Sequence, residues 1–162
     1  MFNLKIESYL KLIFLVSLVS IVSAYFIEHI LGHQPCNLCL IERIPYVLSI
    51  ILIILNYLLE KNEKFIILLL IIIFAFSLII SIYHFGIEQG FFEESAACGI
   101  KNSVEIISKD ELLKQLLEKN ISCKDVTFRI FGLSLTTFNI LISLIIIILL
   151  TKILRNYEKF KN

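Results

Sequence analysis

Two cysteines three positions apart carry the first chemical signal in this chain. Cys36 and Cys39 form a Cys-Asn-Leu-Cys motif within the stretch GHQPCNLCLIER, residues 32–43. Pro35 has no backbone N–H and suits the first turn of a helix, so we expect a helix to begin there. The positive end of a helix stabilises a thiolate and lowers its pKa. The motif is therefore compatible with a redox-active dithiol, a pair of zinc ligands or a structural disulfide.

Three charged or titratable residues are candidates for binding a ligand near these cysteines. Arg43 follows Cys39 by four positions, so it lies one helical turn further along, where its guanidinium can stabilise a thiolate or bind a polar head group. His84 and Glu88 are also four apart and share one helical face. A charged residue beside a long apolar run is a functional hint. The alternative for His84 is an interfacial residue without a chemical role.

Cys98 and Cys123 are the other two cysteines, with 24 residues between them. Four cysteines allow three connectivities. The natural pairing is Cys36–Cys39 and Cys98–Cys123, but exchange among all four is chemically open. The bridge between Cys98 and Cys123 is either a structural staple or an exchangeable bond. The small residues around Cys98 predict that it is open to another protein.

Zinc is disfavoured at the sequence level. Structural zinc sites take four ligands, usually in two close pairs. Here the second cysteine pair is widely separated, and His29 and His33 would have to complete the set. We therefore predict no metal site.

Four apolar runs dominate the rest of the sequence. The chain has 162 residues, 58% of them hydrophobic, and a net charge of +1, which gives no reason to expect nucleic-acid binding. A membrane-spanning helix needs about 20 apolar residues. We predict a single all-α membrane domain over residues 1–162, a four-helix bundle with spans at about 9–31, 38–59, 65–87 and 130–151. Val22-Ser23-Ala24 resembles a signal-peptidase site, but the apolar run continues to Leu31, which favours an anchor.

The distribution of positive charge predicts which side of the membrane each loop occupies. Residues 1–11, 60–64 and 152–162 hold eight Lys and Arg in 27 positions, whereas residues 28–43 and 88–129 hold seven in 58. The positive-inside rule makes the first group cytoplasmic, together with both termini. The loops at about 32–37 and 88–129 then face an outer, oxidising compartment, and so do the cysteines.

The long loop contains the pattern of a short amphipathic helix. Ser108 and Glu111 fit a capping box at a helix start. Four leucines follow on one face, with charged residues opposite, up to Lys119. We expect this helix to lie on the membrane surface, or else to pack on side chains of the loop itself.

The combination of these features resembles the DsbB family of bacterial inner-membrane disulfide-bond-formation proteins. The resemblance covers nearly the whole chain: four spans, Cys-x-x-Cys followed by Glu42-Arg43, a Tyr-His-x-Gly-x-Glu pattern at His84 and Glu88, and a second loop with two cysteines. In the related vitamin K epoxide reductase group the loop pair precedes the Cys-x-x-Cys, whereas here it follows.

The resemblance implies an enzyme, a quinone-dependent protein thiol oxidase of the bacterial inner membrane. Its partner would be a periplasmic thioredoxin-fold protein like DsbA, and its electron acceptor ubiquinone or menaquinone held among membrane lipids. The partner would attack Cys98, the released Cys123 would attack Cys36, and Cys39 would pass the electrons to quinone. Arg43 would stabilise the Cys39 thiolate and the quinone, with His84 and Glu88 lining the site.

Two other functions remain compatible with the residues. A membrane scaffold with two structural disulfides would need no redox activity. A reductase that moves electrons outward is disfavoured only by the resemblance, and measuring the reduction potentials of the two cysteine pairs would determine the direction.

Overall fold

The protein folds as a bundle of long helices. The computed structural model describes residues 2–59, 63–94, 98, 122–124, 128–130 and 132–161. Its elements are α1 (Phe2–His29), α2 (Asn37–Ile41), α3 (Ile44–Leu59), α4 (Glu63–Glu88), β1 (Arg129–Ile130), β2 (Leu133–Ser134) and α6 (Leu135–Lys161). The two strands pair antiparallel and form a small hairpin ahead of α6. The expected helix at residues 108–119 lies outside the described residues.

Within the described part of the chain, four helical segments are long and apolar enough to cross a membrane. They are Ile6–His29, Asn37–Leu58, Glu63–Glu88 and Leu135–Arg155. The second combines α2 and α3. The prediction of an all-α membrane bundle is therefore confirmed.

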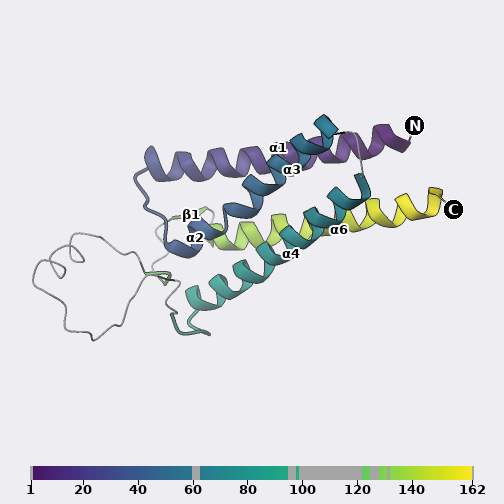
Figure 1. The fold of residues 1–162 in the computed structure, drawn as a ribbon. Coiled ribbons are helices and arrows are strands. Elements are labelled where there is room, and N and C mark those ends of the chain that lie inside the picture. Colours follow the sequence, from purple (N-terminus) through teal and green to yellow (C-terminus); the bar gives the residue numbers. More distant parts are fainter. Residues whose placement is uncertain are drawn as a thin grey trace, which may run out of the picture.

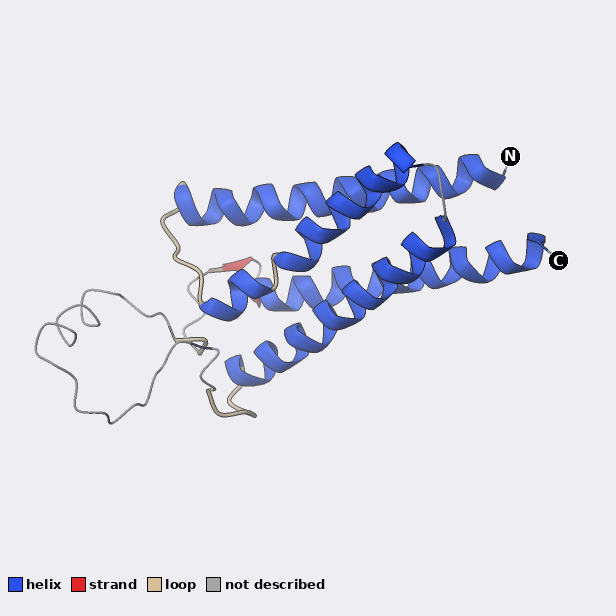
Figure 2. Ribbon diagram, in the orientation of Figure 1, coloured by secondary structure: helices blue, strands red, loops and turns tan. Residues whose placement is uncertain are grey.

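The helices lie side by side, and both ends of the chain are at the same end of the bundle (Figure 1). Helix α4 packs against α6 and α3, and α1 packs against α3. The short helix α2 and the hairpin lie at the opposite end, where the helices give way to loops (Figure 2).

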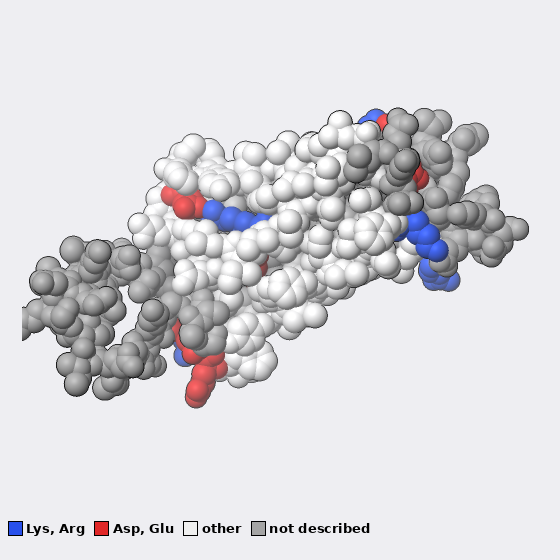
Figure 3. Space-filling model, viewed as in Figure 1, with Lys and Arg blue, Asp and Glu red and all other residues white. Residues whose placement is uncertain are grey.

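The outer surface of the bundle is apolar. Leu58, Ile79 and Ile148 expose 73%, 66% and 57% of their surface. Charged side chains gather toward the two ends of the bundle, and the middle of the face shown is uncharged (Figure 3). Because hydrocarbon does not penalise exposed Leu and Ile, this belt is the surface expected to meet lipid tails.

The interior divides into two apolar clusters. The larger includes Ile53, Ile67, Phe74 and Leu150, which join α3, α4 and α6 and are all fully buried. The smaller contains five buried residues: Cys36, Leu38, Ile87, Cys98 and Cys123. All four cysteines therefore lie at one end of the bundle, since Cys39 packs against the same cluster.

Buried serines bring the helices close together. Ser17 on α1 and Ser49 on α3 share a hydrogen bond of 2.8 Å, and Ser143 on α6 donates to Ser77 on α4 at 3.2 Å. All four are fully buried. Small polar residues at helix contacts are typical of membrane bundles, because they permit close approach and satisfy each other.

A break in the second span positions the first cysteine motif. Helix α2 begins at Asn37 rather than at Pro35, because Cys36 is its N-cap, with extended backbone angles. The chain then turns at Glu42 and Arg43 before α3 resumes. Pro45 cannot donate a hydrogen bond to the preceding turn, which accounts for the interruption. Glu42 and Arg43 consequently lie at a bend, where both line a cavity.

Candidate active site

Cys36 and Cys39 lie in direct contact as free thiols. Their Sγ atoms are 2.7 Å apart, and the backbone N–H of Cys39 donates to the Cys36 Sγ at 3.2 Å. Cys36 therefore accepts in place of the oxygen that usually caps a helix start. It is 6% exposed, and Cys39 is half-buried.

Cys36 is the thiol that these contacts ionise. The thiol of Cys39 donates a hydrogen bond to it, and this lowers the pKa of Cys36 to about 4, despite burial, with a further contribution from His84. Since thiolates and not thiols attack disulfides, Cys36 is held in its reactive form.

The reactivity of Cys36 is expected to be independent of pH across the neutral range. A pKa depressed to about 4 means that the thiolate persists above that pH and is lost only as the pH falls through it. Alkylation of Cys36 by iodoacetamide, followed by mass spectrometry of its peptide, should therefore change less than about twofold between pH 6 and pH 9. The alkylation rate of glutathione, the reference thiol, should increase by about two orders of magnitude over the same pH range. A similar increase in the alkylation rate of Cys36 would contradict its assignment as a thiolate at neutral pH.

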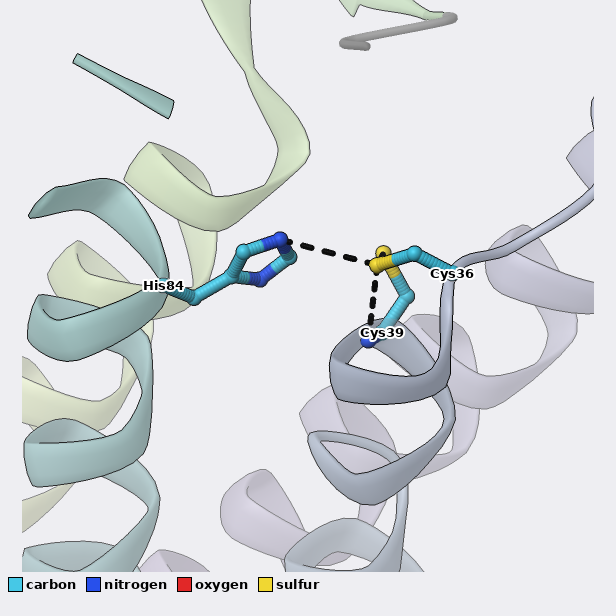
Figure 4. A group of neighbouring side chains, drawn as sticks. All are labelled: Cys36, Cys39 and His84. Atoms are coloured by element: carbon cyan, nitrogen blue, oxygen red, sulfur yellow. Dashed lines mark hydrogen bonds between the residues drawn. The ribbon is translucent and has the colours of Figure 1, made fainter. Parts of the chain in front are cut away.

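His84 connects the cysteines with two carboxylates. Its Nε2 atom lies 3.6 Å from the Cys36 Sγ (Figure 4), and its Nδ1 atom lies 3.0 Å from Oε1 of Glu42. The side chain is 2% exposed. A carboxylate on Nδ1 fixes the ring and leaves Nε2 to exchange a proton with the thiol, as in acid–base pairs of other thiol enzymes. The structure thus places His84, predicted from the sequence as a site residue, beside the Cys36 thiol.

Glu88 lies next to His84 and is almost fully buried. Its Oε1 atom is 3.9 Å from His84 Nε2 and accepts a hydrogen bond of 2.5 Å from Thr136. Its Oε2 atom is buried without a hydrogen-bond partner. A buried polar atom without a partner is costly, so it marks a position where a ligand group fits.

Arg43 is held from the side of α1. Its Nη1 atom lies 2.5 Å from Oε2 of Glu28, and its guanidinium lies over the ring of Tyr25, 5.3 Å from the ring centre. The residue lines the same cavity as Cys39. Arg43 therefore has an ion-pair partner, Glu28, that its spacing from Cys39 did not predict.

Removing the carboxylate of Glu28 is expected to destabilise the protein. The pair is only 16% and 25% exposed, so Glu28→Gln leaves a mostly buried guanidinium without its counter-ion. We expect the free energy of unfolding to fall by about 1–3 kcal/mol, a value between those for exposed and for buried ion pairs. Thermal unfolding in detergent measures it. The matched control is Glu7→Gln, which breaks the exposed pair with Lys11 and should change little. Equal stability of both variants would contradict a structural role for the Glu28 pair.

Cys98 and Cys123 form a disulfide, with their Cα atoms 5.6 Å apart. The two residues are 1% and 3% exposed, because they pack against Cys36 and Ile87. The expectation that Cys98 is open to another protein is therefore wrong for this conformation. The structure instead brings the two cysteine pairs into one buried cluster, one pair bridged and the other free.

A cavity of about 340 Å³ opens against this cluster. Its polar wall includes Cys36, Cys39, Arg43, His84, Glu88 and Cys123, and its apolar wall comes largely from α1 and α6. Tyr46 and Asn139, which also line it, are hydrogen-bonded to each other, and Asn139 donates to Ser81 at 2.7 Å. The volume and the few polar groups are those of a small-molecule site.

Three residues of the site were not assigned a role from the sequence. Glu28 and Glu42 interrupt apolar runs, and a charge at that position is a signal that was available. Thr136 gave no signal, because a threonine in an apolar helix is common. Its role depends on α6 packing against α4, which brings its hydroxyl to Glu88.

The fold and site together define an integral membrane protein with two adjacent thiol–disulfide pairs. The chain belongs to the DsbB family: the profile described as disulfide bond formation protein DsbB matches residues 7–153. It is 29% identical over 141 residues to an uncharacterised protein of Rickettsia prowazekii, covering 86% of this chain and 82% of that one. It is 26% identical over 153 residues to disulfide bond formation protein B of Marinobacter nauticus, covering 91% of each. No solved structure matches.

Proposed function

We propose that this membrane disulfide-formation protein is a quinone-linked thiol oxidase. It takes electrons from a periplasmic thioredoxin-fold dithiol protein and passes them through Cys98/Cys123 and Cys36/Cys39 to a membrane quinone. The observation that carries the proposal is the single cluster that contains both cysteine pairs and borders a cavity. A scaffold with two structural disulfides would not need a free dithiol next to an acid–base pair.

The residues of the cavity fit a quinone. Its apolar wall suits a ring and the start of an isoprenoid tail, and Arg43 offers N–H donors for a carbonyl oxygen. The buried Oε2 atom of Glu88 lacks a partner that a ligand could supply. A bound quinone supplies a sink for two electrons and two protons. Arg43, His84 and Glu88 are the residues that would hold it.

Exchange between the two cysteine pairs follows ordinary thiol–disulfide chemistry. A partner thiolate attacks the Cys98 sulfur, the Cys98–Cys123 bond breaks, and Cys123 leaves as a thiolate. Cys123 then attacks the Cys36–Cys39 bond, so that Cys39 leaves with the electron pair. The second thiol of the partner displaces Cys98 from the partner, and the Cys98 thiolate then attacks Cys123, which restores the Cys98–Cys123 bond and releases Cys36. The partner must first displace the side chains that bury Cys98. A bridged outer pair with a free inner pair corresponds to the stage at which the electrons have reached Cys36 and Cys39.

The protons of the inner dithiol leave through His84. Its Nε2 atom is placed to take the Cys36 proton, while the Glu42 carboxylate on Nδ1 stabilises the imidazolium that results. Glu88, 3.9 Å from the same nitrogen, can accept that proton and present it to the cavity. Each oxidation of the dithiol to a disulfide releases two electrons and two protons.

The charge asymmetry of the loops supports the orientation in this proposal. The side with both termini is denser in Lys and Arg and would be cytoplasmic. The cysteine end would then face the periplasm of a bacterial inner membrane, where disulfides persist.

Reconstitution tests this function directly. Detergent-purified protein is mixed with a reduced DsbA-like protein and either ubiquinone or menaquinone, and quinone reduction is followed by absorbance. We expect turnover with at least one quinone, together with oxidation of the partner in equal amount. No turnover with either quinone would refute the proposal.

A further inference from the structure

Three ligand atoms of types that zinc prefers converge at the inner dithiol. The Sγ atoms of Cys36 and Cys39 and a ring nitrogen of His84 all lie within 4.8 Å of one another. In a tetrahedral zinc site, a sulfur and a nitrogen ligand are separated by about 3.5 Å and two sulfurs by about 3.8 Å. The observed distance from Cys36 Sγ to His84 Nε2 is 3.6 Å. The two sulfurs, at 2.7 Å, need to separate by about 1 Å.

Glu88 is the nearest carboxylate that can move in as a fourth ligand, although it is not part of the group of three atoms within 4.8 Å of one another. Its Oε1 atom lies 3.9 Å from His84 Nε2, whereas a nitrogen and an oxygen ligand on one zinc ion are about 3.3 Å apart, so the carboxylate has to move inward to coordinate. Its side chain is 6% exposed, and its Oε2 atom is the buried oxygen without a partner. A metal-binding role would satisfy this oxygen.

The neighbours of these four residues resemble the outer layer of a metal site. Histidine ligands commonly bond a carboxylate through their second nitrogen, which fixes the ring for coordination. Glu42 occupies that position on Nδ1 of His84 at 3.0 Å. Thr136 fixes the carboxylate of Glu88 in the same way, by a hydrogen bond of 2.5 Å.

Charge also favours a cation at this position. Two buried carboxyl groups, Glu42 and Glu88, and two thiols surround a single imidazole, and Arg43 is neutralised by Glu28. Buried negative charge requires compensation. A divalent ion placed among the sulfurs supplies it.

We propose that the reduced Cys36/Cys39 pair, with His84 and Glu88, binds one Zn²⁺ ion and is thereby held out of thiol–disulfide exchange. Zn²⁺ takes the place of the protons that Cys36, Cys39 and His84 hold between them, which are released, and no electrons move. The disulfide form offers no thiolates, so binding is restricted to the reduced state. The site would make the protein sensitive to free zinc only while the inner pair is reduced. This binding does not depend on the proposed function.

The test measures metal binding directly. Protein with Cys98→Ala/Cys123→Ala, which removes the outer thiols, is reduced with a phosphine, desalted, and titrated with Zn²⁺ in competition with a chromophoric chelator. We expect one zinc per chain in the reduced form and none after oxidation. Co²⁺ should give the visible bands of a tetrahedral site and the near-ultraviolet bands of thiolate ligation. Absence of binding by the reduced protein would overturn the proposal.

Variants separate a built site from capture by the dithiol alone. His84→Gln removes a ligand and should weaken zinc binding by more than about 100-fold, while Glu42→Gln, in the outer layer, should weaken it by about 10–100-fold. The matched control is His29→Gln, an exposed histidine bonded to the Tyr25 carbonyl, which should bind as the parent does. If His84→Gln binds zinc as tightly as the parent, the ion is held only by the cysteines and the proposal fails. Should the double alanine variant not fold, the same comparison is made with the outer disulfide intact.

Discussion

Replacing Cys39 with alanine is expected to abolish quinone-dependent oxidation of the partner. Turnover should fall by at least about 1,000-fold, to the background rate, because no second thiol remains to form the inner disulfide and release electrons into the cavity. The variant should accumulate a mixed disulfide instead. The Cys36 thiolate can still attack the Cys98–Cys123 bond, which forms a Cys36–Cys123 bond and releases Cys98, but no Cys39 thiol remains to resolve it. Quinone reduction by absorbance measures the loss, and non-reducing mass spectrometry identifies the trapped bond.

The Cys39→Ala result also separates an oxidase from a scaffold. A scaffold has no redox activity to lose, and its stability would change only modestly, because Cys39 is half-buried and the alanine still fits. Circular dichroism confirms that the variant is folded. Turnover that continues without Cys39 would show that electrons reach the acceptor by another route.

The fold was predictable because four apolar runs near the length of a bilayer leave few alternatives to helices. Which helices pack against each other could not be predicted from the sequence. Nothing in the apolar runs indicates that α4 lies against α6, which is what brings Thr136 to Glu88. The serine contacts that permit it, such as Ser77 with Ser143, join residues 66 positions apart.

The site was predictable to the extent that its chemistry is local in sequence. Cys36, Cys39 and Arg43 are grouped by helical spacing, as are His84 and Glu88. Which atoms face each other depends on tertiary structure: the Glu42 carboxylate meets His84 across 42 positions, and Glu28 meets Arg43 from another helix. The burial of Cys98 could not be deduced from its small neighbours either, because Ile87 and Cys36, which cover it, are distant in sequence.

The same four side chains support two uses of one dithiol. With the pair reduced, His84 can move the Cys36 proton or, together with Glu88, coordinate a metal. Both uses require the imidazole to be oriented by Glu42. The two proposals are therefore linked by geometry at His84, although each can fail without the other.

Replacing His84 with glutamine is expected to slow quinone reduction by about 100-fold or more, which is the usual contribution of a positioned acid–base group. In the parent, Cys36 is already ionised above pH 4 or so, chiefly through the hydrogen bond from Cys39 and with a further contribution from His84. Without the imidazole, the pKa of Cys36 rises but is still lowered by Cys39, and the remaining proton of the dithiol has to pass to solvent instead of to His84. The residual rate of the variant should therefore increase with pH through the neutral range, whereas the Cys36 reactivity of the parent stays constant.

Stopped-flow measurement of quinone reduction between about pH 6 and pH 9 checks both the size and the direction of this effect. His29→Gln is the matched control, because that histidine is exposed and lies on α1, away from the polar wall of the cavity. A His84→Gln rate that is reduced but shows no increase with pH would mean that the imidazole only orients the cysteines. A rate equal to that of the parent would remove His84 from the proton path altogether, and the Glu42 carboxylate would then have no proton to stabilise.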